Sequence, residues 1–502
     1  MVKYISYVAQ KGITVMKRTT KVAVLLLLAV LFCLQLLACK QPETPGGEVP
    51  PSINPPSERV EPDIEKKDYN GTFSVLHYTT TNHEWTNPWD EIVPASGMET
   101  RPGDLIGNDI FERAAWLEQE YGITVTNEYI EYTKLPTTMS TIKTSGGTEY
   151  QLLATMGRSA QVLMGKGYFF NMAEIPGINF ENPWWNDSAL EALSLGDYVE
   201  FAVSDMLLID KSATMAMYYN IPMANDLQLD GFYDAVRDYE WTIERLAEYA
   251  EVGLQPDGDD DWDMDDVYGI VANDDPVHAL YIGSGNRFME KDENGNYYYS
   301  YGTGDTMLVM TDLLTDIMYA DFYWNSYVHA ESPDFASGGS LFTFDKVKRC
   351  MKLREMQDDY GVLPIPMYSE DQKQYYSLVS NYHDSMFAVI NTNVNSKELI
   401  GAALELMGYY SYYEIYNDFY DVVIQNRGTR DEESKRMLQL IFETRTYDMG
   451  LVYDPYGNTA NVIRITGTQS SDVASQWSEM QSKREDTERE LEELIKQFNG
   501  NS

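Results

Sequence analysis

Trp85, Asn87 and Trp89 stand close together in a polar, proline-containing segment, residues 83–90 of this 502-residue chain. Two tryptophans in such a segment are poor candidates for a deep core. A sugar ring has apolar faces that stack on aromatic rings, and hydroxyls that pair with amides and carboxylates. We therefore expect this loop to contact a ligand of that kind.

Arg158 follows residues 150–155, which predict a third strand of the sheet. Loops at the carboxyl ends of strands line the ligand crevice of open α/β sheets. A guanidinium there can bond two hydroxyls at once through its planar fork of N–H groups. Arg158 is thus a second candidate contact, with an ordinary solvated arginine as the alternative.

Alternating aspartates between residues 257 and 266 suggest a cation site. Asp259, Asp261, Asp263 and Asp265 can supply oxygens to one calcium ion. The spacing departs from the EF-hand loop, because methionine occupies the place of its turn glycine and isoleucine that of its bidentate glutamate. A solvated acidic loop is the alternative, and apart from possible calcium we expect no cofactor.

The sequence lacks the common motifs of hydrolases and nucleotide-binding enzymes. It has no Gly-x-Ser-x-Gly elbow, no His-Glu-x-x-His and no phosphate-binding Gly-x-x-x-x-Gly-Lys, and its five histidines are widely spread. Cys350 lies in a helical pattern with no histidine pattern to activate it, so we expect a buried structural thiol.

The charge balance excludes several classes of partner. Asp and Glu number 79 against 37 Lys and Arg, which gives a formal net charge of -42. Nucleic acids require a basic face, so they are not expected as partners. The hydrophobic content of 43% is enough for large cores, so the bulk of the chain is expected to fold.

The first 38 residues read as an export signal. Five basic residues accompany an apolar run from Val22 to Ala38, and no acidic residue occurs before Cys39. A retained membrane anchor is the alternative, and translation from Met16 would give a signal of normal length. Leu36-Leu37-Ala38-Cys39 resembles the lipobox of bacterial lipoproteins, which implies lipidation of Cys39.

Cleavage before Cys39 would change the charge and the cysteine count. It removes five positive charges and no negative ones, so the formal net charge goes from -42 to -47. Only Cys350 would remain as a free thiol, so no internal disulfide is expected. The proline-rich residues 39–70 predict an extended tether that holds a folded body away from a membrane.

The body reads as an α/β fold. A strand at 72–78, a helix from 108 to about 122 and a strand at 123–130 predict a parallel crossover unit. Further patterns predict strands at 214–220, 267–271, 341–344 and 386–390, and helices at 160–170, 241–250, 346–357, 397–410 and 471–498.

Several short motifs, in this order, resemble the extracellular solute-binding proteins of ABC importers, family 1, the maltose-binding-like group. The motifs are Met217-Tyr218-Tyr219-Asn220, Glu240 to Leu246, Asp266-Val267-Tyr268-Gly269, Phe335 to Phe342 and Tyr360 to Pro366. Each is weak alone, and the ordered set spans nearly the whole chain after Cys39.

This resemblance implies two α/β lobes with a hinge and an interlobe ligand cleft. It implies approximate boundaries of 71–212 and 378–425 for the first lobe, and of 213–377 and 426–502 for the second. The extended stretch 361–366 is expected to cross between lobes, with an ordinary loop as the alternative. Trp184, Trp185 and Trp241 are expected to pack in the core.

Three further candidate ligand contacts follow from the resemblance. Trp324 and Asp345 are candidates in the second lobe, and Tyr382 is a candidate near the expected hinge. The implied protein is a monomer on the extracellular face of a bacterial cytoplasmic membrane. It would bind a carbohydrate and deliver it to the transmembrane subunits of an ABC permease. A secreted glycoside hydrolase, or a receptor for a peptide or another polar solute, stays open as an alternative.

Overall fold

The computed structural model describes residues 59–79, 92–93, 105–258, 262–273, 276–301, 306–326, 329, 331–380, 385–424, 432–458 and 473–500. The chain divides into two units, Met1–Pro51 and Ser52–Ser502. All described residues belong to the second unit, so the expected signal and Cys39 lie outside them. No helix among the described residues is long and apolar enough to cross a membrane.

The first lobe is built on a four-stranded sheet in the order β12-β3-β1-β2. Strands β1 (Gly71–Thr79) and β2 (Ile123–Glu131) are parallel and are joined by helix α3 (Leu105–Tyr121), which confirms the predicted crossover unit. Strand β3 (Leu152–Thr155) is parallel to β1, and β12 (Met386–Val389) returns antiparallel to β3. Helix α3 ends at Gly122, whose φ of 61° favours glycine.

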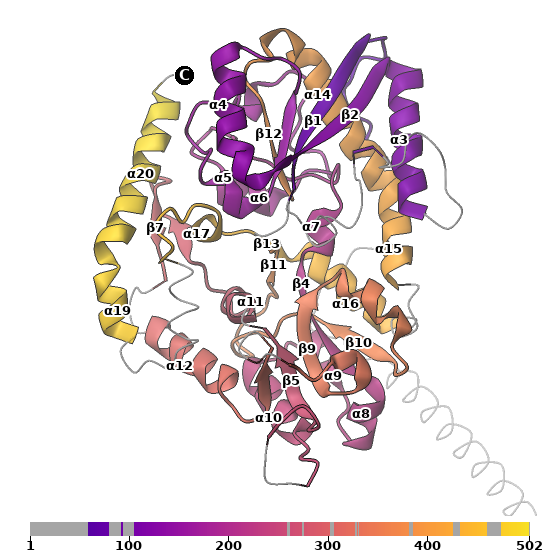
Figure 1. Cartoon of the computed structure of the whole chain (residues 1–502), viewed down its shortest axis with the longest axis vertical. Coiled ribbons are helices and arrows are strands. Elements are labelled where there is room, and N and C mark those ends of the chain that lie inside the picture. Colours follow the sequence, from indigo (N-terminus) through magenta and orange to yellow (C-terminus); the bar gives the residue numbers. More distant parts are fainter. Residues whose placement is uncertain are drawn as a thin grey trace, which may run out of the picture. The chain divides into compact units, whose positions relative to one another are not determined.

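Alternate residues of this sheet enter two separate hydrophobic clusters, as the two-residue repeat of a strand requires. Leu76 and Leu153 face one cluster, which the C-terminal helix α20 (Gln481–Asn499) covers with Leu491. Residues such as Val75 face the other cluster, which helix α14 (Lys397–Tyr410) covers (Figure 1). The inner strands are therefore buried on both faces, whereas the edge strand β2 leaves Thr124, Thr126 and Glu128 exposed.

The second lobe has a five-stranded sheet in the order β10-β4-β9-β5-β8. Its strands are β4 (Met215–Asn220), β5 (Tyr268–Ala272), β8 (Tyr323–Asn325), β9 (Ser340–Lys346) and β10 (Tyr360–Leu363). Strand β5 is parallel to β8 and β9, whereas β4 is antiparallel to both of its neighbours. Trp241 and Cys350 are fully buried beside this sheet, as expected.

Three sequence predictions about these elements are wrong. The helix expected at 160–170 is a single turn, α5 (Gly157–Ala160), because Gly165 and Gly167 adopt positive φ angles that no helix contains. The helix expected at 346–357 is only α13 (Arg349–Lys352) and a 3-10 turn. The stretch 361–366 does not cross between lobes, because β10 pairs with β4 inside the second sheet.

The C-terminal helical region contacts the cores of both lobes. It is broken at Met480 into α19 (Val473–Glu479) and α20, drawn in yellow in Figure 1. Trp477 packs in the cluster of the second lobe, whereas Phe498 stacks on Tyr198 of the first with ring centroids 3.9 Å apart. The expected lobe boundaries stay a prediction.

Candidate ligand site

Three chain segments pass side by side between the two sheets. Residues 213–214 precede β4, residues 377–380 lie between the second and first sheets, and residues 444–447 follow helix α16 (Glu432–Glu443). The Ser380 N–H donates to the Ala213 carbonyl at 3.1 Å, and the Val379 N–H donates to the Thr446 carbonyl at 3.1 Å. These backbone bonds join the segments into one narrow connection, which we call the crossing segments.

A buried cluster of charged side chains fixes the crossing segments. Lys211 donates to Asp205, and its Nζ lies 3.5 Å from Oδ1 of Asp210. Arg445 places Nε 3.2 Å from Oδ2 of Asp210. Two carboxylates therefore balance two cations in a region where nearly all water is excluded. Breaking one partner of such a set leaves a buried charge uncompensated.

Burial and the neighbouring charges have opposing effects on the pKa values in this cluster. It raises the pKa of Asp205 above its ordinary value, and the neighbouring Lys211 only partly offsets that effect. For Arg445, burial alone would lower the pKa, but the carboxylates of Asp210 and Asp205 outweigh it and the pKa is raised. The guanidinium therefore stays charged.

The carboxyl end of β3 meets the crossing segments at a small cavity of about 10 Å³. That is roughly the space one water molecule needs. Gly157, Ser380, Ser385 and Tyr447 are among its lining residues. Arg158 is exposed. Because it directly follows Gly157, its backbone lies close to the crossing segments. A crevice between the lobes is expected at this edge of the sheet.

In the second lobe, two of the predicted residues lie at or near the carboxyl ends of parallel strands. Asp345 is half-buried near the end of β9, and its Oδ1 accepts from the Lys346 N–H at 2.7 Å. Trp324 lies in the edge strand β8, where its ring stacks on His329 with centroids 4.0 Å apart. The ring of Tyr268 is tilted against the same tryptophan, with centroids 5.0 Å apart.

The indole nitrogen of Trp324 is buried and has no hydrogen-bond partner among the described residues. A buried donor without an acceptor costs free energy, so such a group calls for an acceptor that the described residues do not supply.

The remaining predicted contacts lie outside the described residues. These are Trp85, Asn87 and Trp89 of the expected ligand loop, and Tyr382, which was expected near the hinge. Ligand contact by these residues, and by Arg158, Trp324 and Asp345, stays a prediction.

The acidic loop has local structural roles where it is described. Asp266 accepts from the N–H groups of Asp257 and Asp263, each at 2.8 Å, and Asp263 accepts from the Asp265 N–H. Asp259 and Asp261 lie outside the described residues. Within the described part of the chain, no group of three or more His, Cys, Asp or Glu side chains could hold a metal ion.

Comparisons with known proteins identify the fold. UspC of M. tuberculosis is 11% identical, with a TM-score of 0.51 over 83% of this chain and all of that chain. This chain has the two-lobe fold of ABC solute-binding proteins. No protein-family model matches it. No curated protein matches it either.

Two further solved structures are similar to this two-lobe chain. One is the ABC substrate-binding protein Lmo0181 of Listeria monocytogenes in complex with cycloalternan, 11% identical, with a TM-score of 0.47 over 86% of this chain and 99% of that one. The other is the maltodextrin-binding domain MalE of Bdellovibrio bacteriovorus bound to maltotriose, 13% identical, with a TM-score of 0.47 over 85% and 99%.

Sequence reasoning missed the charged cluster of this two-lobe protein. Every residue from Val199 to Asn220 is buried, although Asp205, Asp210 and Lys211 lie within that run. Four charges inside a largely apolar stretch, those of these three residues and of Glu200, were the available signal, because charged side chains are rarely buried unless paired. Their partner Arg445 is too distant in the chain to be recognised from spacing.

Proposed function

We propose that this protein is the solute receptor of an ABC importer and that it binds a carbohydrate between its two lobes. The observation that carries the proposal is the set of three adjacent crossing segments between two sheets, with polar and aromatic side chains at the ends of strands in both lobes. Such a connection lets two rigid bodies close around a ligand through a few backbone rotations. Ligand contacts to both lobes would supply the free energy of closure.

The three described candidate side chains favour a neutral ligand rich in hydroxyls. Trp324 offers a ring and an indole N–H without a described acceptor. Asp345 offers a half-buried carboxylate, and Arg158 an exposed guanidinium. Rings with planar hydrogen-bonding groups suit a sugar, and the formal charge of -42 disfavours a polyanion.

We further propose that Cys39 carries the lipid that holds the receptor at the outer face of a bacterial cytoplasmic membrane, next to its permease. Mass spectrometry of the native N-terminus tests this point. A diacylated Cys39 at the mature N-terminus is expected, and release of the protein from membranes by Cys39→Ala. An unmodified and uncleaved terminus would refute it.

A thermal-shift screen of a glycan library tests the binding proposal on protein that begins at Lys40. One glycan class should raise the melting temperature, because a ligand that binds only the native state stabilises it. Analysis of the recovered glycan separates the alternatives. An intact sugar supports a receptor, cleavage products indicate a glycoside hydrolase, and a response only to peptides or other solutes would replace the carbohydrate.

A further inference from the structure

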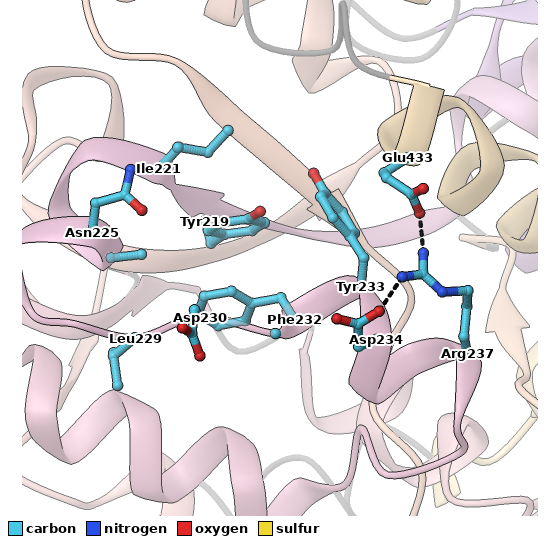
Figure 2. A pocket seen from close by; sticks show the side chains of 12 residues that line it. Tyr219, Ile221, Asn225, Leu229, Asp230, Phe232, Tyr233, Asp234, Arg237 and Glu433 are labelled. Carbon is cyan, nitrogen blue, oxygen red and sulfur yellow. Dashed lines mark hydrogen bonds and ion pairs between the residues drawn. The ribbon is translucent and has the colours of Figure 1, made fainter. Parts of the chain in front are cut away.

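A second pocket, of about 280 Å³, lies in the second lobe at the end of the sheet away from the crossing segments. Figure 2 shows the side chains that line it. It is formed by the last part of β4, by α8 (Ile221–Asp226) and α9 (Phe232–Arg237), and by the start of α16. At about 3.3 Å per residue, Tyr219 in this pocket lies about 13 Å along β4 from Met215, which follows the crossing segments. The pocket is thus separate from the proposed carbohydrate site.

One wall of the pocket is aromatic and rigid. Tyr219 stacks on Phe232 with centroids 4.4 Å apart, and the edge of Tyr233 approaches Tyr219 at 6.0 Å. Gly361 of β10 makes this arrangement possible, because a Cβ there would lie 2.1 Å from the Tyr219 ring and 2.6 Å from the Tyr233 hydroxyl. That hydroxyl is itself fixed by Ser434 at 2.9 Å.

The charged groups of the pocket are unbalanced. Arg237 forms ion pairs with both Asp234 and Glu433, as Figure 2 shows, so its guanidinium is already occupied by carboxylates. Asp230, in the loop between α8 and α9, makes no hydrogen bond or ion pair with any described residue. Glu433 also accepts from Arg436 at 3.0 Å, so three carboxylates and two guanidinium groups leave a formal excess of one negative charge, which Asp230 carries.

We propose that this pocket binds a small organic ammonium compound with an apolar body. The half-buried ring of Tyr233 and the carboxylate of Asp230 both attract a cation, and the apolar side chains of Ile221 and Leu229 can cover its carbon atoms. The volume lies at the lower end of the range for ligand pockets, which is roughly 300–1,000 Å³. It therefore suits a small molecule and not an oligosaccharide. The negative excess excludes anions.

The test uses three probes of similar shape: n-butylammonium, n-butanol and butyrate. Each is titrated into protein that begins at Lys40, at constant ionic strength, with saturation-transfer NMR as the readout. Butylammonium should bind more tightly than butanol, and butyrate should not bind. Equal binding of butanol and butylammonium, or no binding of butylammonium, overturns the proposal.

Two variants assign the binding to this pocket. Asp230→Asn should weaken butylammonium binding by about fivefold, the effect of one carboxylate near 4 Å in water. Asp226→Asn is the matched control, because Asp226 is an exposed aspartate on α8 that does not line the pocket, and it should leave the affinity unchanged. Leu229→Trp should abolish binding by filling the space. An equal loss in both aspartate variants, or full binding by Leu229→Trp, overturns the proposal.

The carbohydrate site provides an independent check. Trp324→Ala should leave butylammonium binding unchanged, because Trp324 does not line this pocket. A loss of butylammonium binding in this variant would place the probe at the other site and so refute the proposal. The ammonium proposal can therefore be refuted without refuting the carbohydrate proposal, and the reverse is also true.

Discussion

The indole N–H of Trp184 donates to the carboxylate of Glu405 at 3.0 Å, although 221 positions separate the two residues in the chain. Trp185 donates to the other carboxylate oxygen at 2.9 Å, and Asn182 and the Asn179 N–H complete the set. Four donors thus converge on one buried acid. Glu405 therefore connects helix α14 through hydrogen bonds to the loop that contains both tryptophans.

Replacing this acid by its amide should destabilise the first lobe. In Glu405→Gln, an NH₂ group takes the place of an acceptor oxygen and faces donors, so at least one buried hydrogen bond is lost. We expect the free energy of unfolding to fall by about 2–3 kcal/mol. Urea titration measures the loss, with the exposed Glu398→Gln as control. Equal stability of the two variants would contradict the role assigned to Glu405.

Arg445 and Asp210 should be coupled across the crossing segments. Arg445→Met leaves the buried carboxylates with only Lys211, so we expect a loss of about 3–5 kcal/mol. Adding Asp210→Asn restores neutrality and should recover part of that loss. A double-mutant cycle from urea titrations measures the coupling, expected at about 1–3 kcal/mol. Simple additivity of the two changes would show that the ion pair does not fix the segments.

Stability should depend on the ionisation of Glu200. Burial raises the pKa of this carboxyl to about 7, and the Gly165 N–H bonded to it only partly offsets the effect. The native state therefore holds a proton that the unfolded state has released. This contribution is largest at acidic pH and is lost as the pH rises from about 4.5 to about 7.

Glu200→Gln removes this titration. As the pH rises from acidic to mildly alkaline, the stability of the variant relative to the unchanged protein should increase by about 3 kcal/mol, because burial raises the pKa of Glu200 from about 4.5 to about 7. Urea titrations at both pH values measure the difference, and the exposed Glu181→Gln should show none of it. A parallel pH dependence in the protein and in Glu200→Gln would refute the assignment.

Trp324 should be a strong contributor to carbohydrate affinity. Once the glycan screen has identified a ligand, Trp324→Ala should weaken its binding by about 2 kcal/mol, about thirtyfold, as for a buried aromatic contact in an interface. Trp262→Ala is the matched control, because Trp262 contacts the same Tyr268 but is about half exposed. Calorimetric titration compares both. Unchanged affinity in Trp324→Ala would remove this residue from the site.

The parts of the fold that the sequence predicted are those encoded locally. The unit from β1 through α3 to β2, and helix α14, have regular hydrophobic spacing, and the structure places them where that spacing predicts. The predictions that were wrong concern segments whose structure does not depend on regular hydrophobic spacing. Gly165 and Gly167 have φ angles that are incompatible with the helix expected at 160–170, and residues 361–366 take their place from the pairing of β10 with β4.

The candidate site was less predictable because its partners come from distant segments. Trp324 and Asp345 were recognised from residue type and from the family resemblance, but the neighbours of Trp324 were not. Arg445 meets Asp210 only after the chain has crossed between the sheets three times. A single sequence does not reveal which buried acid pairs with which distant base.

The central claim is that two lobes close on a carbohydrate without altering it. Calorimetric titration of the library-selected glycan, followed by mass analysis of the recovered sugar, tests this claim most directly. The account predicts saturable binding of one glycan per protein molecule and recovery of an intact sugar. Continuous heat release with cleavage products, or no saturable binding of any glycan, would contradict it.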